Sequence, residues 1–279
     1  MLEPKLYSKY NDLQRADNLF VLDKFLRLIK WNDHEAVLDV GIGDGSFSMT
    51  EVVSRLPKNF RKFVGCDVSE SMVNFAKNTY KNPAVDFVQL DIATENIPRE
   101  LEGEFHHIFS FYALHWVTKQ RQAFANMYKM LKPGGDMLLT FIVRSPVYDI
   151  YRAMVQNNKW QPYMKNEVTK NVYAEYKEPE KVLEKLLRDT GFICHVCRLE
   201  KRTFVYRNME VFKNSCIAIN PVIPRLPSEE VPSYINDFIQ QARNLKFVVS
   251  TDNVNNNEES VVSRHEILIV FASKPLEKK

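Results

Sequence analysis

The first half of the chain alternates between short apolar runs and segments whose apolar residues recur at helical spacing. The apolar runs are mostly continuous, as in strands buried on both faces, and predict strands at 36–40, 62–67, 86–90, 106–112 and 136–143. The helical spacing predicts helices at 17–31, 46–55, 69–80 and 119–131. This alternation indicates an α/β fold: a doubly wound, mostly parallel sheet with helices on both faces.

The alternation ends after Arg144. The remaining pattern predicts helices at 147–160, 165–173, 179–190, 208–219 and 231–245, strands at 192–206 and 265–272, and a polar loop at 253–259. We expect one domain with a single sheet of about seven strands. Residues 1–35 would form an N-terminal lid and helix, and 36–279 a core. Two aromatic-rich insertions, at about 145–176 and 207–245, would form a helical cap at one end of the sheet.

The composition is that of an ordinary globular protein and narrows the range of partners. The 279 residues are 45% apolar, which argues against a disordered chain. The net charge of +3 argues against binding to nucleic acid or to an anionic membrane. Aromatic residues reach 12%, which indicates either a large core or an apolar ligand pocket. No apolar run reaches membrane-spanning length and no leader pattern is present, so we expect a cytoplasmic protein without membrane insertion.

Four cysteines do not make a disulfide scaffold, but Cys194 and Cys197 have CxxC spacing. No second ligand pair for zinc follows, and the surrounding residues indicate a strand rather than the start of a redox helix. Because side chains three residues apart on a strand face opposite sides, we expect the two thiols to diverge.

A glycine-rich loop follows the first predicted strand, with Gly41, Gly43 and Gly45 before a helix. Such glycines allow a tight turn and a close approach of a ligand, and Asp67 ends the second strand, where a carboxylate can bind both ribose hydroxyls. At this point a nicotinamide dehydrogenase fits equally well. Asp39 and Asp91 add two more carboxylates, which would repel a pyrophosphate and attract a sulfonium and an ammonium. Charge therefore favours S-adenosylmethionine.

Residues 36–143 also carry four motifs in a fixed order. They resemble the successive motifs of class I S-adenosylmethionine-dependent methyltransferases, and they read Val37-Leu38-Asp39-Val40-Gly41-Ile42-Gly43-Asp44-Gly45, Gly65-Cys66-Asp67, Leu90-Asp91 and Leu131-Lys132-Pro133-Gly134-Gly135. The resemblance implies a Rossmann-like, seven-stranded sheet with one antiparallel strand, which 265–272 can supply.

The same resemblance implies roles for individual residues. The glycines would pass close to the methionine part of the cofactor, Asp67 would bind the ribose, and Asp91 with Ile92 would contact the adenine. Ser110 and Phe111, at the end of the fourth strand, would border the sulfonium. The full set of expected cofactor residues is Tyr10, Asp39, Gly41, Gly43, Gly45, Asp67, Val68, Met72, Asp91, Ile92 and Ser110.

The molecule that accepts the methyl group is suggested by Gln14 in the N-terminal segment and by Leu114-His115-Trp116 after the fourth strand. Together they resemble the carboxyl methyltransferases of small acids. The chain length and the segments Tyr7-Ser8-Lys9-Tyr10, Phe111-Tyr112-Ala113-Leu114-His115-Trp116 and Cys216-Ile217-Ala218-Ile219-Asn220-Pro221 resemble, over nearly the whole chain, the insect enzymes that methylate juvenile hormone acids and farnesoic acid. The resemblance implies that Gln14 and Trp116 hold the acceptor carboxylate with neutral N–H groups, with His115 as a further donor or positive field. Phe111, Tyr151 and Val222 are the expected substrate contacts. An apolar slot for a sesquiterpenoid would draw on Tyr148, Tyr151, Met154, Trp160, Met164, Phe212, Ile217, Val222 and Ile223.

The expected reaction is displacement of methyl from the sulfonium by a carboxylate oxygen, which gives a methyl ester and S-adenosylhomocysteine. The acid is already ionised at pH 7, so neither a general base nor a metal is needed. The chain would act as a monomer or homodimer.

Two alternative functions stay open: a methyltransferase for another small acid or a macromolecule such as tRNA or a protein carboxylate, and a catalytically silent subunit with this fold. The missing basic stripe argues against tRNA, and the intact glycines with Asp67 argue against a silent subunit.

Overall fold

The computed structural model describes residues 3–164, 171–246, 248–249 and 260–277. Its sheet has the strand order β3-β2-β1-β4-β5-β8-β6, in which β8 is antiparallel to both of its neighbours and the other strands of this path are parallel to one another. The strands are β1 Ala36–Val40, β2 Lys62–Asp67, β3 Val85–Gln89, β4 Phe105–Phe111, β5 Leu131–Arg144, β6 Ile193–Tyr206 and β8 Ser260–Ser273, and the short β7 Val248–Val249 pairs with β8. The predicted α/β sheet with one antiparallel strand is confirmed.

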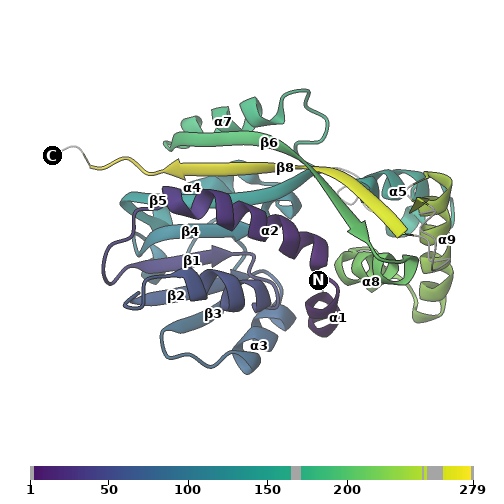
Figure 1. Cartoon of the computed structure of the whole chain (residues 1–279), viewed down its shortest axis with the longest axis horizontal. Coiled ribbons are helices and arrows are strands. Elements are labelled where there is room, and N and C mark those ends of the chain that lie inside the picture. The colour runs from purple at the N-terminus through teal and green to yellow at the C-terminus, as the bar shows by residue number, and fades with distance from the viewer. Residues whose placement is uncertain (1–2, 165–170, 247, 250–259, 278–279) are drawn as a thin grey trace.

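Helices cover both faces of this sheet, and for that reason β1 is buried along its whole length. Val37 of β1 packs with α2 (Asp12–Phe25) and α3 (Glu70–Thr79) on one face. Leu38 packs on the opposite face with α4 (Gln120–Met130) and α7 (Pro179–Asp189). Figure 1 shows α2 lying across the sheet and α7 beyond β6. The alternation of the strand's side chains between two helical layers explains why the first half of the pattern reads as continuous apolar runs.

Three other helices gather where β6 and β8 extend past the rest of the sheet (Figure 1). They are α5 (Pro146–Met154), α8 (Met209–Ile219) and α9 (Val231–Asn244), with the short α1 (Pro4–Lys9) against α8. The division of the chain into a lid at 1–35 and a core with a cap stays a prediction. Among the described residues, no helix is both long enough and apolar enough to cross a membrane.

Several predicted boundaries need correction. The helix expected at 17–31 begins earlier, at Asp12. Its first turns bury polar residues together with apolar ones, so the apolar pattern does not mark its start. The helix gives way to a 3₁₀ turn after Phe25. The helix at 46–55 is irregular and contains a π turn at 48–52. The helix expected at 147–160 stops at Met154. Three residues later, the Asn157 side chain accepts a hydrogen bond from the Lys159 N–H in a turn. Most of the helix expected at 165–173 and the loop at 253–259 lie outside the described residues.

The expectation that Cys194 and Cys197 diverge is wrong. The register of β6 against β8 shifts between Cys194 and Val196, and this irregularity cancels the simple alternation of side chains. The two thiols interact, which lowers the pKa of Cys194 and raises that of Cys197. Cys197 also donates to the carbonyl of Glu180 at 3.2 Å.

Candidate functional site

The loop after β1 lies against the end of β2 and against Ala113, two residues after β4. Gly41, Gly43 and Gly45 all have positive φ, at 76°, 60° and 80°. The Gly41 N–H donates to the carbonyl of Cys66 at 2.7 Å, and a Cβ at Gly41 would lie 2.1 Å from the Cβ of Ala113. Glycine at position 41 is therefore required both by the backbone angle and by the space.

Asp67 holds this loop from the neighbouring strand. One carboxylate oxygen accepts from the Gly43 N–H and the other from the Ser69 N–H, both at 2.9 Å. A carboxylate offers about four lone-pair sites, so Asp67 keeps capacity for a further donor such as a ribose hydroxyl. Sequence reasoning gave Asp67 a role toward the ligand but did not show that it also shapes the glycine loop.

A cavity rich in acceptor oxygens lies between the glycine loop and the N-terminal helices. Three buried oxygens there have no hydrogen-bond partner: Gln14 Oε1, Asn18 Oδ1 and Asp44 Oδ2. Its walls are Tyr7, Asn11, Gln14, Arg15, Asn18, Asp39, Gly41, Ile42, Asp44, Phe47, Ser48 and Phe111. Because unpaired buried acceptors call for a donor, this cavity fits a ligand that presents a cationic ammonium. We name it the oxygen-lined cavity.

Asp39 is the most perturbed carboxyl group of this cavity. Burial raises the pKa of Asp39 to about 7 and the charge of Asp67 adds to the rise, while a hydrogen bond from the Ser48 hydroxyl opposes it. A cation bound nearby would favour the ionised form.

The remaining cofactor residues from the sequence prediction lie outside this cavity. Val68 follows β2 and is exposed, and Asp91 follows β3 next to the buried Ile92. The ends of these strands are joined by a hydrogen bond from the Leu90 N–H to the Asp67 carbonyl at 3.0 Å, so these residues share one edge. Met72 is fully buried, and the buried Ser110 hydroxyl donates to the Val40 carbonyl at 2.8 Å. Their roles toward a cofactor stay predictions.

A second cavity adjoins the first and shares Tyr7 and Gln14 with it. We name it the tyrosine-lined cavity. It brings together Gln14, His115 and Trp116, which the resemblance grouped, with Tyr151 of α5, one of the expected substrate contacts. Their roles toward an acceptor stay predictions. The full lining is Tyr7, Leu13, Gln14, Tyr112, His115, Trp116, Ile142, Ser145, Val147, Tyr148, Tyr151, Tyr206, Ile219 and Ser263. Phe111 lines the oxygen-lined cavity instead, and Val222 is fully buried and lines neither cavity.

His115 is buried in the wall of the tyrosine-lined cavity, and its Nδ1 has no hydrogen-bond partner. Burial lowers the pKa of His115 to about 3, so the imidazole is neutral at pH 7. His115 therefore does not supply the positive field considered above, but its neutral imidazole can donate or accept a hydrogen bond.

A buried carboxylate behind this wall was missed by sequence reasoning. Asp17 of α2 accepts from the Tyr112 hydroxyl at 2.5 Å and the Arg202 Nε at 2.8 Å, and lies 2.6 Å from the His265 Nε2. These bonds join α2 to the residue after β4, to β6 and to β8. Tyr112 itself has a positive φ of 57°. The charged and hydrogen-bonding partners lower the pKa of Asp17 against the opposing effect of burial.

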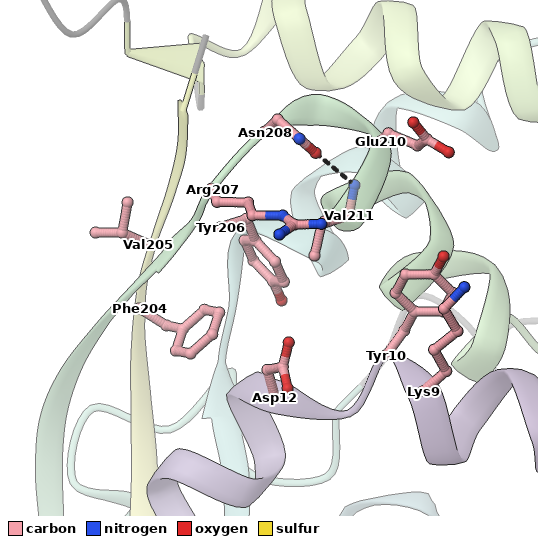
Figure 2. Close-up of a pocket in the computed structure, with 10 residues that line it drawn as sticks. All are labelled: Lys9, Tyr10, Asp12, Phe204, Val205, Tyr206, Arg207, Asn208, Glu210 and Val211. Atoms are coloured by element: carbon pink, nitrogen blue, oxygen red, sulfur yellow. Dashed lines mark hydrogen bonds between the residues drawn. The ribbon is translucent and has the colours of Figure 1, made fainter. Parts of the chain in front are cut away.

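Tyr10, expected to bind the cofactor, lies elsewhere. Figure 2 shows it with Lys9 and Asp12 in a cleft that faces the end of β6 and the start of α8. This cleft has a volume of about 520 Å³, and Tyr206 lines both it and the tyrosine-lined cavity. The Asn208 side chain closes the turn into α8 by accepting from the Val211 N–H at 3.0 Å.

Within the described part of the chain, no group of three or more His, Cys, Asp or Glu side chains could hold a metal ion.

Sequence comparisons relate the chain to known methyltransferases. A family model described as a methyltransferase domain matches residues 37–135. The juvenile hormone acid O-methyltransferase of Drosophila melanogaster is 33% identical over 98% of this chain and 93% of its own length. The enzyme of the same name from Bombyx mori is 33% identical over 96% of each chain.

Solved structures share the fold at low sequence identity. Phosphoethanolamine N-methyltransferase 2 of Haemonchus contortus, solved with S-adenosyl-L-methionine, aligns with a TM-score of 0.51 and 17% identity. The alignment covers 93% of this chain and 52% of that one.

Proposed function

Because the chain belongs to the class I S-adenosylmethionine-dependent methyltransferases, we propose that it methylates the carboxylate of a small apolar acid. The acceptors we propose are sesquiterpenoid acids, namely juvenile hormone acids or farnesoic acid. One observation carries the proposal: neutral hydrogen-bonding groups of Gln14, His115 and Trp116 line one aromatic cavity, and this cavity meets the oxygen-lined cavity at Tyr7 and Gln14. The relatives' printed names support the same acceptor class.

The residues of the oxygen-lined cavity fit the cofactor. Asn18 and Asp44 would accept from its ammonium, the glycine loop would pack against its methionine part, and Asp67 would accept from its ribose hydroxyls. When bound, S-adenosylmethionine supplies a methyl group on a sulfonium, and S-adenosylhomocysteine is the product. Sequence reasoning placed Tyr7 in the expected lid without a role of its own and missed Asn18, because the contacts of both residues depend on how α1 and α2 pack against the glycine loop.

The protein's contribution to the reaction is positioning. A carboxylic acid is ionised at pH 7 and attacks as it is, so no side chain has to remove a proton. Gln14 and Trp116 would hold one carboxylate with neutral N–H groups, without burying a countercharge. Well-aligned reactants gain about 7–11 kcal/mol over free encounter. The helices α1 and α2 carry Tyr7 and Gln14 over both cavities and would keep water out.

The direct test is incubation of the protein with methyl-labelled S-adenosylmethionine and a panel of acceptors. The panel holds farnesoic acid, its terminal epoxide, a saturated fatty acid, an aromatic acid, bulk tRNA and a protein extract. We expect label in base-labile methyl esters of the terpenoid acids. Label in tRNA or protein alone would contradict the acceptor proposal, and no label with intact cofactor binding would favour a silent subunit. The cytoplasmic location and the monomeric or homodimeric state stay predictions.

Asp67→Ala is expected to weaken S-adenosylmethionine binding several-fold to tens of fold. A hydrogen bond to a charged group contributes about 1.5–3 kcal/mol, and the substitution also leaves the Gly43 N–H without its partner. Isothermal calorimetry measures the affinity, and Asp67→Asn serves as the control because it keeps one acceptor oxygen and loses less. Unchanged affinity in Asp67→Ala would contradict the ribose assignment.

The rate at saturating cofactor and acceptor is expected to show no inflection near pH 6.5. An ordinary histidine base would lose activity as it gains a proton below about pH 6.5. Burial keeps His115 neutral because its pKa is about 3, well below that range. His115→Asn should accordingly keep measurable turnover with the same pH profile. Complete loss of turnover with cofactor affinity intact would mean that the nucleophile needs deprotonation and is not a carboxylate.

A further inference from the structure

Asp17 of α2 is buried where four elements meet. One of its carboxylate oxygens accepts from the Tyr112 hydroxyl and lies 2.6 Å from the His265 Nε2, and the other accepts from the Arg202 Nε at 2.8 Å. These three partners belong to the segment after β4, to β8 and to β6. Because charge-assisted hydrogen bonds are roughly twice as strong as neutral ones, a carboxylate with three such partners restricts the relative movement of the elements that carry them.

Asp17 itself lines neither the oxygen-lined cavity nor the tyrosine-lined cavity, although its partner Tyr112 lines the second. Both of its oxygens are already bonded to protein donors. A carboxylate in contact with the acceptor would also repel an anionic acid. Any effect of Asp17 on the reaction therefore passes through the residues to which it is bonded.

The first of these connections is the helix α2, which also carries Gln14. Gln14 lies three residues before Asp17, and residues with this spacing are neighbours on one face of a helix. The Arg202 guanidinium attaches to the same helix a second time, because its carbon lies 3.9 Å from the ring centroid of Phe20. The bonds of Asp17 therefore also fix the place of Gln14.

The second connection runs through Tyr112 to the 3₁₀ turn that carries His115 and Trp116. The Tyr112 ring packs edge to face on the His115 ring, with ring centroids 5.9 Å apart. The His115 ring in turn lies 5.0 Å from the Trp116 ring. A continuous line of packed rings thus joins the hydrogen bond at Asp17 to Trp116.

We propose that Asp17 is a positioning residue, which holds Gln14 and Trp116 at the separation at which both N–H groups reach one acceptor carboxylate. This inference rests on the proposed function. The two donors belong to elements far apart in the sequence, and the bond from Tyr112 to Asp17 joins those elements. A displacement of about 1 Å between aligned groups can lower a rate about a hundred-fold, so this bond has a direct bearing on turnover of the acid.

The test is Asp17→Asn, which keeps the size of the side chain and removes its charge. At saturating methyl-labelled S-adenosylmethionine, kcat/KM for farnesoic acid should fall about ten- to a hundred-fold. In a Trp116→Phe background the same substitution should cost less than about threefold, because one of the two positioned N–H groups is already absent. A purely structural role would give the same loss in both backgrounds.

Tyr112→Phe tests the connection itself and keeps the proposal open to refutation if Asp17→Asn does not fold. It deletes one hydrogen bond and keeps the ring, and Asp17 retains Arg202 and His265. We expect kcat/KM for farnesoic acid to fall about tenfold, the size of one hydrogen bond to a charged group. The same change should add little in the Asp17→Asn background.

Glu35→Gln is the matched control. Glu35 is also a buried carboxylate with a histidine partner, since it lies 2.8 Å from the His107 Nε2, and it lines neither cavity. Thermal unfolding should show a lower Tm for Glu35→Gln and for Asp17→Asn alike, because each loses charge-assisted hydrogen bonds. Only Asp17→Asn should lower kcat/KM for the acid.

The outcomes separate the two proposals. Wild-type kcat/KM in Asp17→Asn or in Tyr112→Phe, an undiminished loss from Asp17→Asn in the Trp116→Phe background, or an equal loss in Glu35→Gln overturns the positioning role and leaves the carboxyl methylation standing. Failure of the wild type to methylate any acid of the panel overturns the proposed function and this inference together.

Discussion

Trp116→Phe is expected to lower kcat/KM for the acceptor acid about ten- to a hundred-fold, with the cofactor affinity near that of the wild type. Removing one donor to an ionised group costs about 1.5–3 kcal/mol of transition-state stabilisation. Trp116 lines the tyrosine-lined cavity, and 39% of its surface is exposed. Phe keeps much of the apolar bulk and deletes the N–H. Steady-state kinetics with calorimetry for the cofactor measures both quantities.

Gln14→Ala is the companion variant, and we expect it to lower kcat/KM for the acceptor acid by the same factor. If both donors bind one carboxylate, the double variant should lose less than the sum of the two single losses. Gln14 also lines the oxygen-lined cavity, so its substitution is expected to shift cofactor affinity where Trp116→Phe does not. Fully additive losses, or normal activity of Trp116→Phe, would contradict a shared carboxylate.

Gly41→Ala is expected to weaken cofactor binding more than tenfold and to destabilise the fold by roughly 2–5 kcal/mol. A side chain at positive φ costs about 1–2 kcal/mol, and overpacking a filled site adds about 1–3 kcal/mol. Both conditions hold here, since φ is 76° and the new Cβ would lie 2.1 Å from the Cβ of Ala113. Chemical denaturation and calorimetry measure the two effects.

Gly103→Ala separates the contribution of the backbone angle from that of the clash. Gly103 has φ of 61°, and no atom would lie within 4 Å of a Cβ placed there. It should cost only the backbone contribution, about 1–2 kcal/mol, and leave cofactor affinity unchanged. If the two variants lost the same stability and the same cofactor affinity, the close approach of Ala113 to the glycine loop would not contribute to either.

The sheet and the glycine loop could be predicted because their signals are local. A strand buried on both faces shows as a short apolar run such as 36–40, and Gly41 with Asp67 sits at the ends of adjacent strands wherever such a sheet forms. Gln14, His115 and Trp116 were grouped by resemblance, and the structure brings them to one cavity.

Features that depend on distant contacts could not be predicted. Asp17 has a partner 248 residues away in His265, and no local pattern announces that pairing. The approach of Cys194 to Cys197 depends on a register shift that sequence spacing does not record. Tyr10 and Tyr7 are near neighbours on the chain, yet they line different cavities because α1 ends between them. Likewise, nothing in the sequence distinguishes Tyr148 from Tyr151, whose hydroxyls differ in having a partner.

The position of β8 between β5 and β6 has a consequence for how the protein is made. Both neighbours leave the ribosome before residues 260–273 do, so the growing chain exposes two open strand edges until β8 inserts. His265 and Ser263 arrive with that strand, the first as the partner of Asp17 and the second as part of the tyrosine-lined cavity. Synthesis therefore completes the glycine loop early and the tyrosine-lined cavity late, and a nascent chain carries the first without the second.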